Sequence, residues 1–159
     1  MENYLAANSI ALLADHPDLI PLVARWHYGE WSRGDSSGPF SLWVERIESR
    51  ANQDRIPITY LAFVDGVPTG TAMLIASDMD THPELAPWLA GVFVLPEYRR
   101  RGIASALVRH AVGQAYLLGF PILYLYTNGA ERVYENLGWK TWRREEYEGR
   151  MVTVMEISA

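Results

Sequence analysis

The sequence predicts a mixed α/β fold, in which one sheet is covered by helices on both faces. Strand-like segments occur towards both ends of the chain and alternate with helical patterns in between, an order typical of layered α/β domains. The 159 residues contain no internal repeat, low-complexity tract or break in composition. A chain of this length fits one domain, so we predict a single domain over residues 1–159.

The first half of the chain is predicted to hold two helices between strands. Apolar residues recur every three or four positions in the helical segments, and Asp65-Gly66 between two apolar runs is a strong hairpin signal. Asp15 or His16 can cap the first helix, and Pro17 suits its first turn. The elements are strand Ala6–Leu13, helix Pro17–Trp31, loop Ser32–Pro39, helix Phe40–Asn52, and strands Ile58–Val64 and Thr69–Ala76.

The second half opens with a polar, acidic loop and a short apolar run typical of a central, buried strand. A long helix follows and ends at Gly119, a residue that commonly terminates helices. Glu148-Gly149 predicts the turn of a terminal hairpin. The elements are loop Ser77–Pro87, strand Leu89–Leu95, helix Arg101–Leu118, strand Pro121–Thr127, helix Ala130–Leu137, and strands Trp139–Glu146 and Met151–Ile157.

Composition excludes several classes of function. The chain has no cysteine, so it has no disulfide, thiolate metal site or cysteine nucleophile, and it suits a reducing cytoplasm. Four scattered histidines with no paired spacing make a metal site improbable. A net charge of −5 disfavours nucleic acid and favours cations such as protonated amines, or serves solubility alone. The apolar run Ile10–Ala14 is too short for a signal or a span, so we expect a cytoplasmic protein without a membrane partner.

The segment VFVLPEYRRRGIASA, from Val92 to Ala106, predicts a phosphate site. A buried strand leads through three consecutive arginines, Arg99 to Arg101, into a helix whose first N–H groups are unpaired. Gly102 has no Cβ, so a ligand can approach the backbone there. Walker and dinucleotide fingerprints are absent. The residues alone fit a diphosphate site and a plain strand–turn–helix with a solvated basic turn equally well.

The same segment resembles motif A of the GCN5-related N-acetyltransferase (GNAT) family, whose Gln/Arg-x-x-Gly-x-Gly/Ala pattern is matched by Arg99, Gly102 and Ala104. The later VYENLGW, Val133 to Trp139, resembles the family's motif B. The resemblance implies a GNAT-like acyl-CoA N-acyltransferase fold, with a central, mostly antiparallel sheet flanked by helices. It also implies acetyl-CoA as co-substrate, without a metal.

The resemblance assigns coenzyme contacts to particular residues. Backbone N–H groups from Arg100 to Ser105 would bind the pyrophosphate, and the strand Val92–Val94 would pair with the pantetheine amides. A bulge in that strand would splay it from Pro121–Thr127, and an N–H near Phe93 or Val94 would polarise the thioester carbonyl. The expected cofactor-binding residues are Val92, Phe93, Val94, Arg99, Arg100, Arg101, Gly102, Ile103, Ala104, Ser105 and Asn128. Asn128 is also explained as a turn residue before Gly129.

Transfer of an acetyl group from a thioester to an amine needs a neutral amine, stabilisation of the oxyanion and a proton for the departing thiolate. By motif B, Tyr134 lies at the head of the short helix, near the sulfur, and we assign it the acid role over simple packing. No carboxylate in the strands matches the family's base. The loop residues Asp78, Asp80, His82 and Glu84 are candidates, each of which could equally be solvated. We choose Asp80 as the base, and Asp78 and His82 as substrate-binding residues.

The resemblance also implies that the first two helices shape the acceptor pocket. Trp26 and Trp43 lie on apolar stripes and are predicted to pack in the core, whereas Glu30 and Trp31 are predicted to bind substrate. Without cysteine, direct attack in a ternary complex is the simpler route. The predicted partner is a small-molecule or peptide amine, and a homodimer is compatible with the family.

Two other functions compete with an N-acetyltransferase. The missing carboxylate base keeps open a non-catalytic acyl-CoA-binding sensor or partner module. A nucleotide-binding protein of another kind would also use the basic turn.

Overall fold

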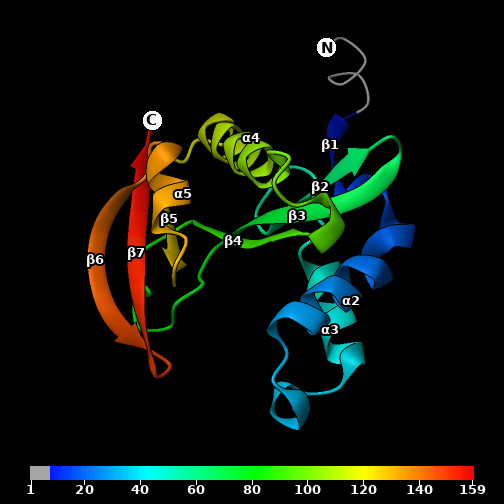
Figure 1. The fold of residues 1–159 in the computed structure, drawn as a ribbon, viewed down its shortest axis with the longest axis horizontal. Coiled ribbons are helices and arrows are strands. Elements are labelled where there is room, and N and C mark those ends of the chain that lie inside the picture. Colours follow the sequence, from blue (N-terminus) through cyan, green and yellow to red (C-terminus); the bar gives the residue numbers. More distant parts are fainter. Residues whose placement is uncertain (1–7) are drawn as a thin grey trace.

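The structure is a computed structural model that describes residues 8–159, and it holds one seven-stranded sheet of order β1-β2-β3-β4-β5-β7-β6 (Figure 1). All neighbours are antiparallel except β4 and β5, as the resemblance implied. Residues 6 and 7 of the first predicted strand lie outside the described part. The strands are β1 (Asn8–Leu12), β2 (Ile58–Val64), β3 (Val67–Ile75), β4 (Trp88–Val94), β5 (Ile122–Thr127), β6 (Lys140–Tyr147) and β7 (Arg150–Ser158).

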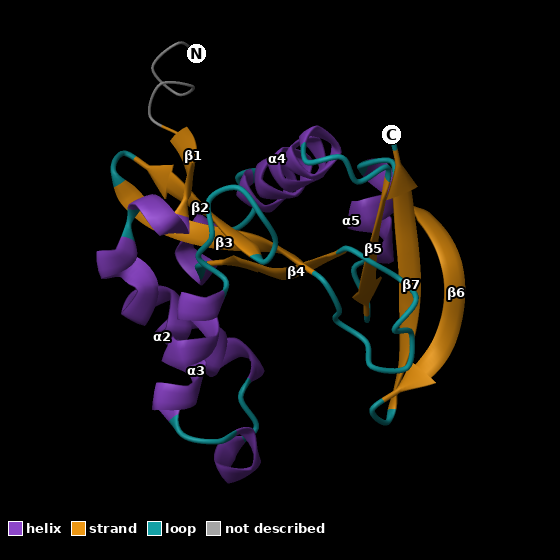
Figure 2. Cartoon of the chain, turned by 180° about the vertical axis from the view of Figure 1, so that it is seen from behind, coloured by secondary structure: helices purple, strands orange, loops and turns teal. Residues whose placement is uncertain are grey.

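Helices cover both faces of the sheet, as predicted. The long helix α4 lies on the face opposite α2 and α3, and α5 lies beside β5 (Figures 1 and 2). Their bounds are α2 (Ile20–Trp31), α3 (Phe40–Ser49), α4 (Ile103–Leu117) and α5 (Glu131–Asn136). Short 3₁₀ turns occupy Leu13–Asp15, Pro17–Leu19, Gly34–Ser37 and Pro96–Tyr98.

The start of the first helix differs from the prediction. Pro17 opens a 3₁₀ turn rather than the α-helix, which begins at Ile20. His16 occupies the cap position of that turn without a side-chain capping bond. The Asp15 carboxylate accepts a hydrogen bond from Gln53 at 3.0 Å instead. A tertiary contact therefore takes the group that was expected to cap the helix.

The sheet's alternating side chains form two apolar clusters, one on each face. On one face, Leu107 and Ala111 of α4 pack against a cluster that includes Leu74 of β3. On the other, Val23 of α2 and Ile47 of α3 pack against Met73. Trp26 and Trp43 are both buried, which confirms their predicted place in the core.

The centre of the sheet is broken at β4, as the resemblance implied. Phe93 pairs with Thr71 and Ala90 with Met73, so β4 has one more residue than β3 between these pairs. This β-bulge contains Gly91 at φ +59°, a conformation that favours glycine. β4 pairs with β5 at only one position, Trp88 with Tyr124. The strands diverge beyond that point (Figure 1), which leaves one edge of β4 without a strand partner.

Candidate functional site

The turn before α4 presents free backbone N–H groups to a cavity of about 430 Å³. The bond from Ala106 N–H to the Gly102 carbonyl, 3.0 Å, closes the first turn of the helix. The N–H groups of Ile103, Ala104 and Ser105 precede that bond, so they have no partner inside α4. Gly102 caps the helix at φ +79°, and a Cβ added there would meet no atom within 4 Å. The backbone is therefore bare at a positive helix end, as an anion site requires.

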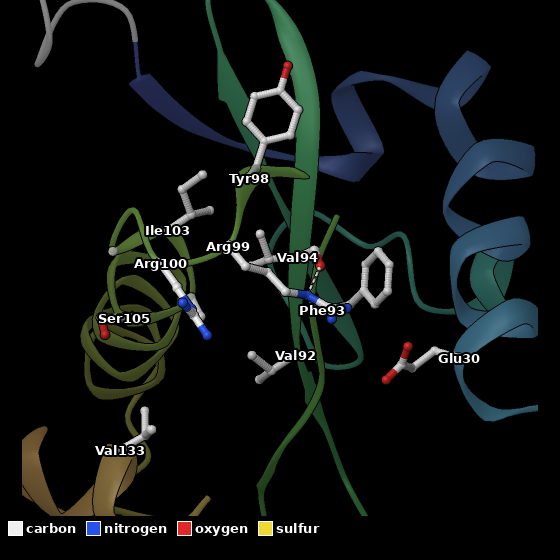
Figure 3. A pocket seen from close by; sticks show the side chains of 12 residues that line it. Glu30, Val92, Phe93, Val94, Tyr98, Arg99, Arg100, Ile103, Ser105 and Val133 are labelled. Carbon is white, nitrogen blue, oxygen red and sulfur yellow. Dashed lines mark hydrogen bonds between the residues drawn. The ribbon is translucent and has the colours of Figure 1, made fainter. Parts of the chain in front are cut away.

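Most of the predicted cofactor residues line this first cavity. Figure 3 shows β4 between the start of α4 on one side and Glu30 of α2 on the other, with the Phe93 ring pointing towards α2. The Arg99 Nε donates to the Val94 carbonyl at 2.9 Å, and its guanidinium lies 5.9 Å from the centre of the Phe93 ring. The predicted residues in the lining are Val92, Phe93, Val94, Arg99, Arg100, Gly102, Ile103, Ala104 and Ser105.

Two predicted cofactor residues lie elsewhere. Arg101 is not part of the lining, and its guanidinium lies 5.0 Å from the centre of the Tyr98 ring. Asn128 lines a second cavity instead, where its side-chain amide donates to the Met151 carbonyl at 3.1 Å. That bond ties the end of β5 to β7.

A buried hydrogen-bond chain holds the bulge of β4 in place. The Thr71 hydroxyl donates to the Gly91 carbonyl at 2.8 Å, so it accepts from His27 Nε2, which lies 2.9 Å away. Burial, together with Arg50 and Arg46, lowers the pKa of His27 to about 3. The imidazole is therefore neutral at physiological pH, with its proton on Nε2. These hydrogen bonds connect α2, β3 and β4 at the point where β4 and β5 diverge.

Gly91→Ala should lower the free energy of unfolding by about 2 kcal/mol or more, since left-handed backbone and overpacking each cost at least about 1 kcal/mol. A Cβ at Gly91 would lie 2.8 Å from Met73 Sδ and 3.1 Å from His27 Cε1. Urea unfolding measures the change. Gly29→Ala is the control, because Gly29 lies inside α2 with nothing within 4 Å of its added Cβ, and it should stabilise. Equal stability of Gly91→Ala and wild type would contradict the assigned constraint.

The second cavity, of about 570 Å³, lies between the diverging strands. Val92 lines both cavities, so the two meet at the bulged strand. Tyr134 lines the second cavity as the fourth of the six residues of α5, half-way along rather than at its head. Burial raises its pKa, and its ring packs edge-on against Trp139 at 6.1 Å. The phenol is therefore protonated at neutral pH and is held by packing.

The loop before β4 contributes one carboxylate to the second cavity, and it is Asp78. Burial raises the pKa of Asp78 to about 6, although Arg50 opposes the shift. A carboxyl that titrates near neutrality inside a cavity is suited to general acid–base chemistry.

The other predicted acceptor-site residues are dispersed. Asp80 is exposed and lines neither cavity. His82 is buried outside both cavities, with Nε2 2.7 Å from Glu145 and its ring against Trp142. Glu30 lines the first cavity, whereas its neighbour Trp31 lines the second and is 42% exposed. Of this group, only Asp78 and Trp31 therefore line the same cavity as Tyr134.

Four arginines line the second cavity that were not predicted from the sequence as site residues. They accompany only two carboxylates, Asp78 and Glu148, so the lining is basic although the whole chain carries −5. The sequence could have indicated two of them, because Arg46 and Arg50 are four residues apart on a predicted helix and therefore share a face. Gly91 inside an apolar strand was likewise a bulge signal. The arginines are Arg33, Arg46, Arg50 and Arg150.

Within residues 8–159, no cluster of three or more histidine or acidic side chains could hold a metal ion. No helix in the same part of the chain is long and apolar enough to cross a membrane.

Comparison with known proteins identifies one family and many solved structures that share this fold. Residues 20–139 match the model of the acetyltransferase (GNAT) family. An aminoglycoside 6'-N-acetyltransferase solved with coenzyme A is 17% identical with TM-score 0.74, covering 94% of this chain and 96% of its own. A Salmonella typhimurium protein solved with acetyl-CoA is 19% identical with TM-score 0.71, covering 96% and 94%.

A third solved structure, a spermidine N-acetyltransferase chimera that includes the Vibrio cholerae protein, is 16% identical with TM-score 0.72 and covers 96% of this chain and 95% of its own. No curated protein matches the chain in sequence. At these identities the solved structures establish the fold, while the family model covers more than half of the sequence.

Proposed function

The chain belongs to the acetyltransferase (GNAT) family, and from that premise we propose that it transfers an acetyl group from acetyl-CoA to a primary amine by direct attack. One observation carries the proposal: the bare first turn of α4 and the bulged strand β4 line one cavity, which meets the cavity of Tyr134 and Asp78 at Val92. One solved neighbour, an aminoglycoside acetyltransferase, holds coenzyme A, and another holds acetyl-CoA. A third is named as a spermidine acetyltransferase. These neighbours support acetyl-CoA as the donor and an amine as the acceptor.

The first cavity fits the coenzyme. N–H groups of Ile103, Ala104 and Ser105, with the positive end of the helix, would bind the pyrophosphate. The β4 edge that lacks a strand partner would pair with the pantetheine amides, as an exposed edge pairs with an added strand. Bound in this way, the acetyl group would lie beside Val92, where the two cavities meet.

The second cavity then supplies the proton transfers. The amine nitrogen attacks the thioester carbonyl carbon, and a β4 N–H near Phe93 or Val94 stabilises the oxyanion. Asp78 takes a proton from the attacking nitrogen. As the carbon–sulfur bond breaks, the Tyr134 phenol protonates the thiolate and later regains its proton from solvent. Burial makes the phenol a weaker acid, but the same desolvation raises the basicity of the thiolate.

This assignment moves the base from Asp80 to Asp78. The choice rests on position, because Asp78 lines the cavity of Tyr134 and Asp80 lies outside it. It also rests on protonation, since a pKa of about 6 leaves Asp78 mostly ionised at pH 7.5 yet basic enough to accept a proton.

The direct test combines acetyl-CoA binding by calorimetry with thiol release in the presence of amines. Because the chain has no cysteine, the protein adds no thiol background to the assay. Binding together with amine-dependent thiol release supports the enzyme. Binding without release on every amine supports the acyl-CoA-binding module. Displacement of acetyl-CoA by ATP would favour a nucleotide-binding protein.

Asp78→Asn should lower kcat/KM on the order of 10²–10⁴-fold, the range for lost general base catalysis. In wild type the rate should rise with pH through about 6, where Asp78 ionises, and this limb should vanish in the variant. The raised folded pKa means that the folded state binds the Asp78 proton more tightly than the unfolded state does, so ionisation weakens stability as pH rises from about 4 to 6. Above pH 6 the variant should therefore be at least as stable as wild type.

A pH–rate profile and thermal unfolding at pH 8 check both parts, with Asp80→Asn as the matched control. An unchanged acidic limb in Asp78→Asn, or its loss in Asp80→Asn, would reject the reassignment.

A further inference from the structure

The charge of the second cavity is opposite to what a simple polyamine requires. Four arginines face two carboxylates, so the ionisable lining carries an excess of positive charge. A polycationic acceptor would be repelled by this positively charged lining, since like charges near a protein surface repel by about 4 kcal/mol at 4 Å. An anionic group on the acceptor would instead be attracted.

Arg50 is one of the two half-buried arginines of this lining, whereas Arg33 and Arg150 are exposed. Arg50 lies at the C-terminal cap of α3, and one guanidinium nitrogen lies 3.5 Å from Met73 Sδ, a weak acceptor. Within residues 8–159 the ion pairs closer than 4 Å are both formed by His82, so no carboxylate pairs with Arg50 at that distance. Burial lowers the pKa of Arg50, and Arg46 adds to the effect. A half-buried planar guanidinium without a close carboxylate is suited to bidentate binding of one.

Arg46 reinforces Arg50 from one turn earlier on α3. Residues four apart on a helix are neighbours, so the two positive charges repel each other. The Arg46 guanidinium is 4.6 Å from the centre of the Trp43 ring, which holds it against the cavity wall. After burial, the same two arginines contribute to the lowered pKa of His27, which lines the same cavity. A bound anion would relieve this repulsion.

Asp78 provides the complementary charge for an amine. It lines the same cavity and interacts electrostatically with Arg50. The cavity thus has a basic wall and an acidic group, beside aromatic surfaces that can contact an apolar body. The aromatic residues are Trp31, Trp43, Tyr126 and Tyr147.

We infer that the acceptor is a small amine that also carries a carboxylate, of which a free amino acid is the simplest example. Its carboxylate binds Arg50, assisted by Arg46, while its amine lies towards Asp78. The inference rests on the proposed acetyl transfer and narrows its substrate class. The reaction is unchanged: the amine nitrogen forms the amide bond, and coenzyme A leaves with a proton.

The test is a thiol-release panel of free L-amino acids, each paired with its neutral carboxamide. At least one amino acid should be acetylated with kcat/KM at least ten-fold above that of its carboxamide. Acetyl-CoA affinity is measured in parallel by calorimetry. If acetyl-CoA binds but carboxamides react as well as the acids, or only amines without a carboxylate react, the inference is wrong. Failure of acetyl-CoA to bind would instead overturn the proposed function.

Variants of Arg50 locate the contact. Arg50→Gln should raise KM for the amino acid about ten- to hundred-fold, the effect of a lost charged hydrogen bond. KM for the carboxamide and the affinity for acetyl-CoA should change little. Arg50→Lys should recover only part of the loss, because a lysine has no planar fork. Arg109→Gln removes an exposed charge of α4 outside both cavities and serves as control.

Thermal unfolding separates recognition from misfolding. Arg50→Gln should melt no lower than wild type, because burial and repulsion from Arg46 disfavour the Arg50 charge more than the attraction of Asp78 favours it. A higher amino-acid KM in a protein of intact stability supports the contact. Equal rises in KM for acid and carboxamide would reject it.

Discussion

Gly102→Glu should abolish acetyl-CoA binding while leaving the chain folded. The new side chain would project where the structure has no atom within 4 Å of the Cβ, beside the free N–H groups of Ile103 and Ala104. Its carboxylate would compete for those groups and repel the pyrophosphate. One such repulsion is worth about 4 kcal/mol at an effective dielectric of 20, so Kd should rise on the order of 10³-fold.

Two controls separate the causes of that loss. Gly102→Ala shares the left-handed strain at φ +79°, about 1–2 kcal/mol, without the bulk or the charge. Gly113→Glu adds the same charge to an open position of α4 away from both cavities. Calorimetry with acetyl-CoA should show a large loss only for Gly102→Glu. Near-normal affinity of that variant would refute the pyrophosphate site and, with it, the proposed coenzyme.

Tyr134→Phe should reduce kcat on the order of 10²–10⁴-fold, the range for a lost general acid. Acetyl-CoA affinity should stay within a few-fold of wild type, because the phenyl ring keeps its packing against Trp139. Steady-state kinetics with calorimetry distinguishes the two effects. Tyr116→Phe, which removes the hydroxyl of a half-buried tyrosine outside both cavities, is the matched control.

An unchanged kcat in Tyr134→Phe would leave only a packing role for the ring. A parallel loss in Tyr116→Phe would show that the assay reports stability rather than proton transfer. A bell-shaped pH profile for wild type that loses its acidic limb in Asp78→Asn would place the proton acceptor and the proton donor on different residues.

The turn at Gly102 illustrates what local sequence can predict. A glycine, a run of arginines and the start of an amphipathic helix are contiguous, so the conformation is decided within about one helical turn. The hairpin at Asp65-Gly66 is equally local, and β2 and β3 form there as predicted, with Asp65 at φ +50°. The predicted helix start at Pro17 was wrong, because the α-helix begins at Ile20. The Asp15 carboxylate, expected to cap it, instead accepts a hydrogen bond from Gln53, 38 residues away.

The loop before β4 illustrates the opposite case. Asp78, Asp80 and His82 alternate in an acidic segment, and nothing local distinguishes them. The structure brings Asp78 into the cavity, leaves Asp80 in solvent and pairs His82 with Glu145, 63 residues later. Each outcome depends on which distant element the loop crosses.

The sequence by itself determined the order of strands and helices, the bare helix start at Gly102 and the family to which the chain belongs, because each depends on contiguous residues. Only the tertiary structure decided that Glu30 and Trp31, adjacent on α2, face different cavities, and that His27 and Thr71 hold the bulge at Gly91. It also decided that the second cavity is basic in an acidic chain. Composition sums charge over the whole chain, whereas a ligand responds to the few charges that the fold brings within several ångströms of it.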